Sequence, residues 1–261
     1  MYRLRICHCI PLLGLLGNAA TAQVRVVTEH LPPYQIDLKN GQASGFATEL
    51  VRQTFNDAGI PYQIEFQSWS RAYQLALRDK DTCIYSISKS ADRQPKFQWI
   101  GELSYNKTAL YGTAKRNDIH LESLEQAKQY VTAVTRDDVT HHYLLANGFV
   151  EGKNLYVLDN ATSQLKVLTS RRQGIDLVII NETILTYRAN ETGHKVSEFR
   201  KLLALPDLPL DFHLACSLKT SKAIVNELRK SLGNLKADGR FDKIVQGWSE
   251  HLPQPASQNE L

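Results

Sequence analysis

Apolar and polar positions follow two different periods along the first part of the chain. β-Branched residues fill 24–28 and apolar residues alternate with polar ones over 62–66, so both segments are predicted strands. Side chains spaced by four over 46–58 predict a helix that ends at Gly59. A second predicted helix over 69–77 precedes a further strand. This β-α-β-α-β order predicts a mostly parallel sheet with helices on its faces.

The same alternation then repeats with different residues. We predict strands over 109–113, 130–135, 155–158, 177–180 and 201–205, with helices between them that include 139–146 and 163–172. A last strand over 212–217 precedes a helix whose apolar face runs from Ile224 to Leu235. A chain of 261 residues with this pattern is long enough for two compact α/β units. Residues 251–261, with two prolines, are expected to form a flexible tail.

The first 22 residues have the layout of a cleavable secretory signal peptide. Arg3 and Arg5 form a charged start, the apolar run over 6–16 is too short to span a bilayer, and 20–22 are small residues that suit cleavage. Pro11 inside the apolar run argues against a buried N-terminal helix. We therefore expect an exported, periplasmic protein.

The charge balance excludes one class of partner. The chain has 31 basic and 27 acidic residues, two of the basic ones lie in the predicted leader, and the others are scattered. Because no stacking-aromatic motif accompanies them, we expect no nucleic-acid binding. No later segment is apolar enough to predict a membrane span. Beyond the leader, Cys83 and Cys216 either form a disulfide in an oxidising compartment or remain two buried thiols, and both interpretations stay open.

The segment from Ser86 to Arg93 carries the clearest candidate chemistry. It follows a β-favouring run and precedes a proline, so we expect the loop that leaves the end of a strand, where open α/β sheets bind ligands. Ser86, Ser88 and Ser90 offer hydroxyls at alternate positions, and the Arg93 guanidinium matches a carboxylate bidentately. The segment is either a carboxylate clamp or a turn with a surface arginine.

Several short motifs recur in an order that resembles one protein family. They are Pro33-Tyr34 after the opening strand, Gly45-Phe46 and Glu49-Leu50 in the first helix, the segment 81–93, Gly174-Ile175-Asp176 before 177–182, and Gly239-Arg240-Phe241 with Gly247-Trp248 near the end. From Val24 to about Trp248 the chain resembles the extracellular solute-binding proteins of family 3, which bind polar amino acids in the periplasm for ABC importers.

This resemblance implies a periplasmic-binding-protein-like type II fold, in which two α/β lobes are joined by two hinge strands with a ligand cleft between them. It assigns residues 23–105 and 212–250 to lobe 1 and 106–211 to lobe 2, with crossings near 104–107 and 206–211. Cys83 and Cys216 both fall in lobe 1. The implied mechanism is hinge closure, in which a ligand that contacts both lobes stabilises the closed state for a membrane partner to recognise.

The resemblance also implies ligand contacts in lobe 1. Arg93 is expected to bind the ligand carboxylate, and Ser86 and Ser88 to line the cleft with hydroxyl and backbone groups. Trp69 falls near a position where an aromatic ring packs over the ligand, and Tyr34 is expected on the same wall. Ordinary core packing is the alternative for both aromatic residues.

In lobe 2 the resemblance points to the turn over 135–138, where a helix N-terminus suits a carboxylate. Arg136 and Asp137 are the predicted contacts there. Asp137 and Asp138 are also good N-cap residues, and capping is the alternative explanation of at least one of them. Asn181 departs from the family, which usually has an aspartate at this position to pair with the α-ammonium of the ligand. An amide carries no charge, so either Glu182 or another acid replaces it, or the ligand lacks that ammonium.

The leading hypothesis is a non-catalytic, monomeric binding protein that delivers a small polar carboxylate, an amino acid or a related compound, to an ABC importer or a membrane sensor. The alternative is an exported enzyme on the same scaffold, similar to cyclohexadienyl dehydratase, with Glu182 as general acid. A scaffold that works through protein contacts is a third class, and the intact Arg93 segment argues against it. We expect no metal and no cofactor, because the side chains of His141 and His142 diverge on their helix and no phosphate or nucleophile motif is present.

Overall fold

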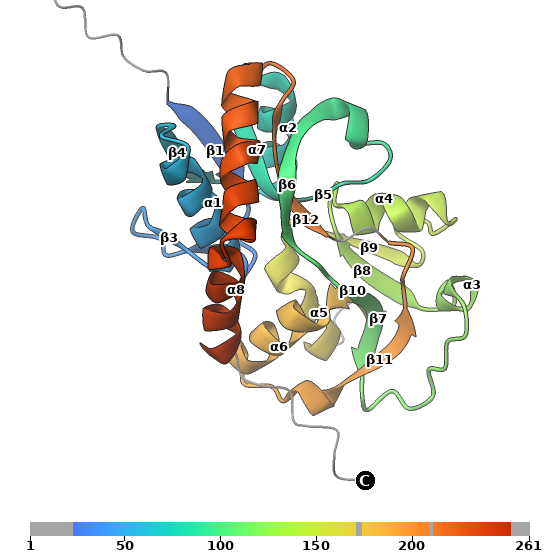
Figure 1. The fold of residues 1–261 in the computed structure, drawn as a ribbon. Coiled ribbons are helices and arrows are strands. Elements are labelled where there is room, and N and C mark those ends of the chain that lie inside the picture. The colour runs from blue at the N-terminus through green and yellow to red at the C-terminus, as the bar shows by residue number, and fades with distance from the viewer. Residues whose placement is uncertain (1–22, 171–173, 209–210, 252–261) are drawn as a thin grey trace, which may run out of the picture.

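The computed structural model describes residues 23–170, 174–208 and 211–251, so the predicted leader and the tail from Leu252 lie outside the described residues. Two five-stranded sheets with flanking helices organise this part of the chain (Figure 1). We call the elements around the sheet that contains β1 the first lobe, and those around the sheet that contains β7 the second lobe. The chain leaves the first sheet after β6, builds the second sheet, and returns to the first at β12.

The first sheet combines strands from both ends of the chain. Its order is β4 (Tyr62–Phe66), β1 (Val24–Thr28), β5 (Thr82–Ser88), β12 (Phe212–Ser217) and β6 (Phe97–Ser104). β1 is parallel to β4 and β5, and β12 is antiparallel to β5 and β6. The helices of this lobe are α1 (Phe46–Asp57), α2 (Trp69–Arg78), α7 (Lys222–Ala237) and α8 (Arg240–His251). A short ribbon of β2 (Ile36–Asp37) and β3 (Ala43–Ser44) precedes α1.

The second sheet has the order β11 (Phe199–Ala204), β7 (Thr108–Thr113), β10 (Ile175–Asn181), β8 (Val131–Thr135) and β9 (Leu155–Leu158). β8 is parallel to β9 and β10, and β7 is antiparallel to β10 and β11. The helices are α3 (Leu124–Ala127), α4 (Val139–Ala146), α5 (Gln164–Ser170) and α6 (Glu182–Glu191). α5 and α6 lie below α7 and β6 of the first lobe, so the two lobes face one another (Figure 1).

Strand β5 extends further than the sequence predicts. Ser86 and Ser88 belong to the strand rather than to a loop, because β12 pairs with β5 as far as Phe212 opposite Ser88. Ser86 has a positive φ of 57°, where the register of β5 against β12 shifts by a bulge. Bulges re-aim side chains beside functional sites. The predicted loop therefore begins only after Ser88.

Strand β6 is an element that the sequence pattern does not predict. Its burial pattern does not alternate strictly, and Gly101 interrupts its apolar residues. A Cβ at Gly101 would lie 2.8 Å from Leu232 Cδ2, so the glycine permits the close approach of α7 to this strand. The close packing of α7, rather than strand propensity, therefore explains why position 101 is a glycine.

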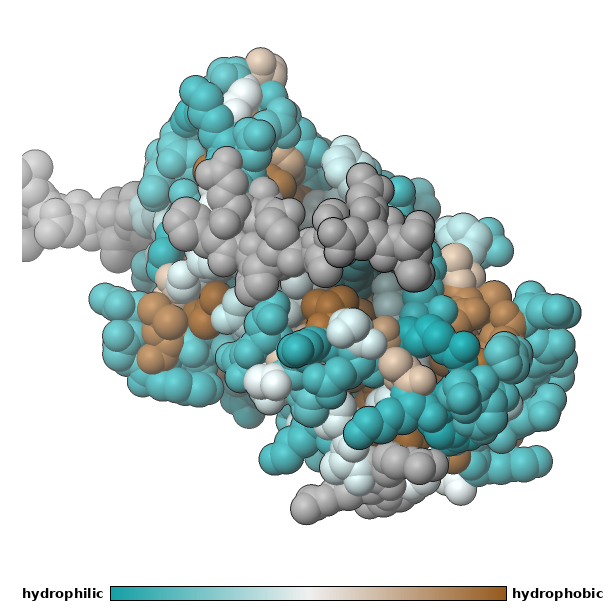
Figure 2. Space-filling view, turned by 90° about the horizontal axis from the view of Figure 1, so that it is seen from below, coloured by the Kyte–Doolittle hydropathy of each residue, from teal (hydrophilic) through white to brown (hydrophobic). Residues whose placement is uncertain are grey.

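The face seen in Figure 2 is mostly hydrophilic, and its apolar residues form small separate patches. None of the helices in the described ranges combines the length and the apolar character needed to cross a membrane. The apolar residues of the sheets are mostly buried: all seven residues of β5 and all six of β12 are shielded from solvent.

Candidate functional site

A cavity of about 40 Å³ lies between the lobes, lined by residues from both. The polar residues from the first lobe are Glu29, Ser86, Ser88 and Arg93. Those from the second lobe are Asp138, Thr140, Gln164, Asn181 and Arg188. Trp69 and Phe212 contribute aromatic walls. Since one water needs roughly 10–15 Å³ of such volume, the cavity accepts only a small molecule without side-chain movement.

Arg93 is held from three sides. It directly precedes the 3₁₀ turn Gln94–Lys96, and only 2% of its surface is exposed. Its guanidinium carbon lies 5.2 Å from the centre of the Trp69 ring and 5.1 Å from that of Tyr73. Its Nη2 donates to the Asp137 carbonyl oxygen at 3.0 Å, and its buried Nη1 has no hydrogen-bond partner among the described residues. A pre-oriented cation therefore retains free donor capacity beside the cavity.

Asp137 connects the two lobes. Its carbonyl oxygen accepts hydrogen bonds from Arg93 and, at 2.9 Å, from Trp69 Nε1. Its carboxylate accepts from Ser70 Oγ at 2.8 Å. These contacts need a left-handed backbone at Asp137, whose φ is 57°, and His141 Nδ1 accepts from the Asp137 N–H at 3.2 Å. The lobes are therefore closed on one another in this structure.

The predicted serines line the cavity, although one hydroxyl is already engaged. Ser86 Oγ donates to Gln35 Oε1 at 2.7 Å, and both residues are almost fully buried. Ser88 is 2% exposed and faces the same cavity. The chain brings these hydroxyls together with Arg93, as the spacing along 86–93 predicts.

Asn181 lines the cavity, but both ends of its amide already have partners. As the N-cap of α6, its Oδ1 accepts from the Ile184 N–H at 2.8 Å, and its Nδ2 donates to Tyr34 Oη at 3.3 Å. Tyr34 does not line the cavity: it is 1% exposed, and its ring centre lies 4.5 Å from that of Phe46 and 4.9 Å from that of Phe212. Tyr34 thus packs in the core beside the site.

Arg136 and Glu182 lie away from the cavity lining. The Arg136 side chain is half exposed and faces Asp159 at 3.6 Å. Glu182 is exposed at the first position of α6. The Asp137 side chain also lies outside the lining, because it is turned to Ser70. Asp137 accepts a hydrogen bond from Arg93 through its backbone carbonyl oxygen only.

Three charged residues of the cavity were not predicted as ligand contacts: Glu29, Asp138 and Arg188. Glu29 directly follows β1, so its place after the carboxyl end of a parallel strand was a signal that could have been used. Asp138 caps α4, which agrees with the capping alternative given for Asp137 and Asp138. Arg188 lies in the last turn of α6, and nothing in the local sequence distinguishes it.

These residues give the cavity an unusual balance of charge, because each lobe contributes one carboxyl group and one guanidinium. Burial, and then the neighbouring Asp138 carboxylate, raise the pKa of Glu29 to about 8, against the opposing effect of Arg188. Burial also raises the pKa of Asp138 and lowers that of Arg188 to about 10. Such perturbed groups in a cavity are typical of functional sites. The arrangement suits a small ligand with anionic groups.

The cysteines of the first lobe form a disulfide in the structure, where Cys83 of β5 faces Cys216 of β12. Across the described residues, no three His, Cys, Asp or Glu side chains gather as a group that could hold a metal ion.

Comparison with known families identifies this architecture. The sequence profile of the bacterial extracellular solute-binding proteins, family 3, matches residues 24–251. The chain belongs to this family. The match covers nearly all of the described residues, so the resemblance drawn from the short motifs is confirmed. No curated protein matches the chain.

Solved structures share the fold of this family 3 chain at low sequence identity. A histidine kinase sensor domain similar to periplasmic binding proteins has a TM-score of 0.76 at 19% identity, covering 87% of this chain and 96% of its own. An ancestral arginine-binding protein bound to arginine has a TM-score of 0.74 at 17% identity, and the match covers 87% of this chain and 97% of that protein. A periplasmic His/Glu/Gln/Arg/opine family-binding protein from Silicibacter pomeroyi, in complex with lysine, has a TM-score of 0.69 at 16% identity. The match covers 87% of this chain and 96% of that protein. The predicted type II periplasmic-binding-protein-like fold of two α/β lobes is confirmed.

Proposed function

We propose that this chain is a periplasmic binding protein that captures a small polar carboxylate, an amino acid or a related compound, between its two lobes. The observation that carries the proposal is Arg93. A fully buried guanidinium without a hydrogen-bonded carboxylate is costly, and among the described residues Nη1 of Arg93 has no hydrogen-bond partner beside the cavity. A ligand carboxylate would supply the missing charge and acceptor.

Closure of the lobes follows from the contacts around Asp137. Trp69, Ser70 and Arg93 of the first lobe all donate to this residue of the second lobe. A ligand that pairs with Arg93 and also contacts the second lobe stabilises this closed state by its differential affinity. In our proposal residues 23–105 with 212–250 move as one body, and 106–211 move as the other.

The proposed context is export and delivery. Residues 1–22 serve as a cleavable signal peptide, the mature chain acts as a monomer in the periplasm, and the closed state is recognised by an ABC importer or a membrane sensor. The binding role agrees with the family and with the amino-acid-binding proteins that share its fold. The dehydratase alternative named Glu182 as its general acid, and this residue is exposed and does not line the cavity.

A thermal-shift screen of the mature protein tests the proposal. The set contains amino acids, their deaminated analogues, and small mono-, di- and tricarboxylates. A ligand at 100 times its dissociation constant adds about 2.7 kcal/mol to the free energy of unfolding, which gives a clear shift. Arg93→Gln is expected to abolish the shift, whereas Arg25→Gln on the surface of the same lobe is expected to retain it. Absence of a shift with every carboxylate would overturn the proposal.

A further inference from the structure

Arg188 is a second buried cation beside the cavity. It lies in the last turn of α6, is 2% exposed, and lines the cavity from the second lobe. Its Nη1 donates to the Ala161 carbonyl oxygen at 2.6 Å and to Gln164 Oε1 at 3.1 Å. Its Nε and Nη2 are buried and have no hydrogen-bond partner among the described residues. Two donors of a charged group thus remain unused at the wall of the cavity.

A structural role accounts for only part of this arrangement. The bonds from Nη1 join α6 to Ala161 before α5 and to Gln164 at the start of α5, and they use a single nitrogen of the guanidinium. The acids of the cavity, Glu29 and Asp138, influence Arg188 through space, yet neither accepts a hydrogen bond from it. Buried charges in proteins are normally paired and hydrogen-bonded. The remaining donors therefore call for an acceptor from outside the chain.

Arg93 has the same property in the opposite lobe. Its Nη1 is also buried without a partner, and both arginines line one cavity of about 40 Å³. We infer that Arg188 binds a second anionic group of the ligand, so that the captured solute is a short molecule with an anionic group at each end, one for each lobe. This inference rests on the proposed function and specifies its ligand class.

The two carboxyl groups of the cavity restrict the proposed class of ligand further. Glu29 comes from the first lobe and Asp138 from the second, and both line the cavity together with the arginines. A ligand with a hydrogen-bond donor or an ammonium group between its two anionic ends satisfies these acceptors as well. Short dicarboxylates and acidic amino acids are therefore the compounds to compare.

The experiment measures dissociation constants by calorimetry for pairs that differ in one charge. L-Glutamate is compared with L-glutamine, L-aspartate with L-asparagine, and succinate with succinamate. We use dianion here for a compound with two carboxylate groups, including glutamate and aspartate, which also carry an ammonium group. In the wild-type protein at least one dianion is expected to bind about 10-fold or more tightly than its amide, because a charged hydrogen bond is replaced by a weaker one. In Arg188→Met this ratio is expected to fall to about one, while Arg93 still binds the remaining carboxylate.

Arg200 provides the matched control. It lies in β11 of the same lobe, has a buried Nε without a partner, and donates Nη2 to the carbonyl oxygens of Arg116 and Ile119, but it does not line the cavity. Arg200→Met is expected to leave the dianion-to-amide ratio unchanged. A merely structural role of Arg188 would weaken both members of a pair equally and leave the ratio unchanged.

The outcomes separate the two proposals. If the amides bind the wild-type protein as tightly as the dianions, the inference is overturned while the proposed function stands. If no carboxylate of either kind binds, both are overturned. Should Arg188→Met fail to fold, Arg188→Lys replaces it; a drop of the ratio by roughly threefold or more supports the inference, because lysine lacks the planar fork of donors. An unchanged ratio in that variant contradicts it.

Discussion

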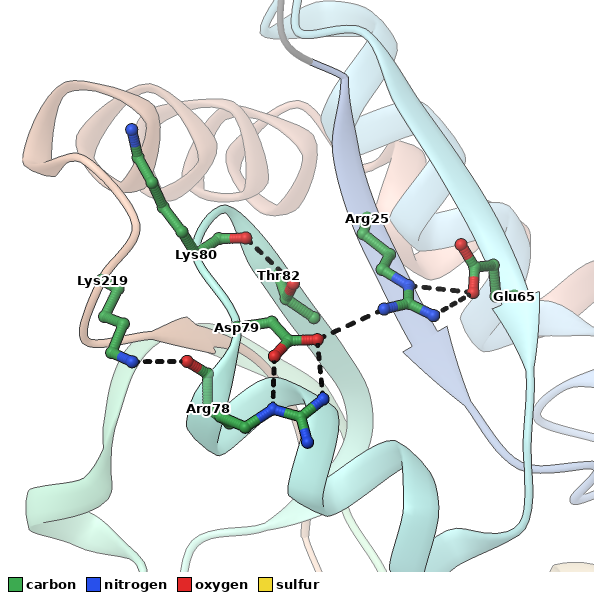
Figure 3. A network of polar contacts seen from close by, with 7 residues as sticks. All are labelled: Arg25, Glu65, Arg78, Asp79, Lys80, Thr82 and Lys219. Atoms are coloured by element: carbon green, nitrogen blue, oxygen red, sulfur yellow. Dashed lines mark hydrogen bonds and ion pairs between the residues drawn. The ribbon is translucent and has the colours of Figure 1, made fainter.

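Two groups of charged residues in this protein differ in how completely they are paired. At the edge of the first sheet, Arg25 donates from Nε and Nη2 to Glu65 and from Nη1 to Asp79, and Asp79 also accepts from Arg78 (Figure 3). Every nitrogen of the Arg25 guanidinium has a partner within the chain. In the cavity, Arg93 and Arg188 are far more deeply buried, yet both retain nitrogens without a hydrogen-bond partner in the part of the chain that the structure describes.

The difference is informative because it runs against the energetic expectation. Solvent can satisfy a partly exposed charge such as Arg25, whereas a buried guanidinium depends on partners in the protein. Unpaired buried groups occur elsewhere too, as at Arg200 Nε, so they are informative only where they line a cavity. The unpaired donors of Arg93 and Arg188 at the cavity, rather than the number of ion pairs, therefore mark the candidate binding site.

The largest expected effect comes from Arg93→Met. Affinity for the best carboxylate of the screen is expected to fall by about 100-fold or more, since removing one partner of a buried charge pair costs roughly 2–5 kcal/mol. The free energy of unfolding of the ligand-free protein is expected to stay the same or to rise, because an unpaired buried charge is removed. Calorimetric titration and denaturant unfolding measure the two quantities. A large loss of ligand-free stability would show that Arg93 is paired for structure, as Arg25 is.

Glu29 makes ligand-free stability depend on pH. Its pKa is raised to about 8, so between the ordinary carboxyl pKa and pH 8 the folded state binds a proton that the unfolded state does not. Stability is therefore expected to fall as the pH rises, by roughly 2–3 kcal/mol between pH 5 and pH 7. Above pH 8 this contribution becomes constant.

Glu29→Gln isolates this effect, because the pKa of each of His30, His142 and His213 is lowered, mainly by desolvation, and these groups give the opposite slope. The difference in unfolding free energy between the wild type and the variant, measured by urea denaturation at several pH values, should shift against the wild type as the pH rises. Parallel curves for the two proteins would mean that Glu29 is not protonated in the folded state.

Trp69→Phe tests the contact between the lobes. The variant keeps an aromatic ring near Arg93 but loses the hydrogen bond from Nε1 to the Asp137 carbonyl oxygen. We expect ligand affinity to fall by about 5- to 10-fold, in line with about 1 kcal/mol for one hydrogen bond. Tyr73→Phe is the control, since Tyr73 stacks on the same guanidinium from the first lobe. Equal affinities of both variants and the wild type would contradict a role of this bond in closure.

The smallest effect is expected for the ion pairs of Arg25 with Glu65 and Asp79. Arg25→Gln should lower the free energy of unfolding by about 1 kcal/mol or less, because partly exposed ion pairs gain little in water. The loss should shrink as salt is added, and ligand affinity should not change. Thermal unfolding at low and high salt measures how the loss of stability depends on salt. A salt-independent loss would show that Arg25 acts through packing instead.

Parts of the site that are contiguous in the sequence could be predicted from it. Ser86, Ser88 and Arg93 lie within eight residues around the end of one strand, and the structure brings all three to the cavity. The prediction was less successful where a side chain could turn either way. Tyr34 packs in the core, and Arg136 faces Asp159 at the surface.

The residues that were missed depend on distant packing. Arg188 reaches the cavity only because α6 packs so that its last turn faces the first lobe, and the pKa of Glu29 is raised first by burial on folding and then by Asp138 of the other lobe. Burial and electrostatic coupling between segments more than 100 residues apart are not properties of a local pattern.

The sequence by itself determined the periods of its strands and helices, hence the α/β class, and the motif order that identifies the family. These are local properties, since propensity and periodicity act over a few residues. Only the tertiary structure decided which charged residues meet in one cavity and which of their donors stay without partners. Desolvation and hydrogen-bond satisfaction arise when the two lobes pack together, and they turn scattered acids and arginines into a binding site.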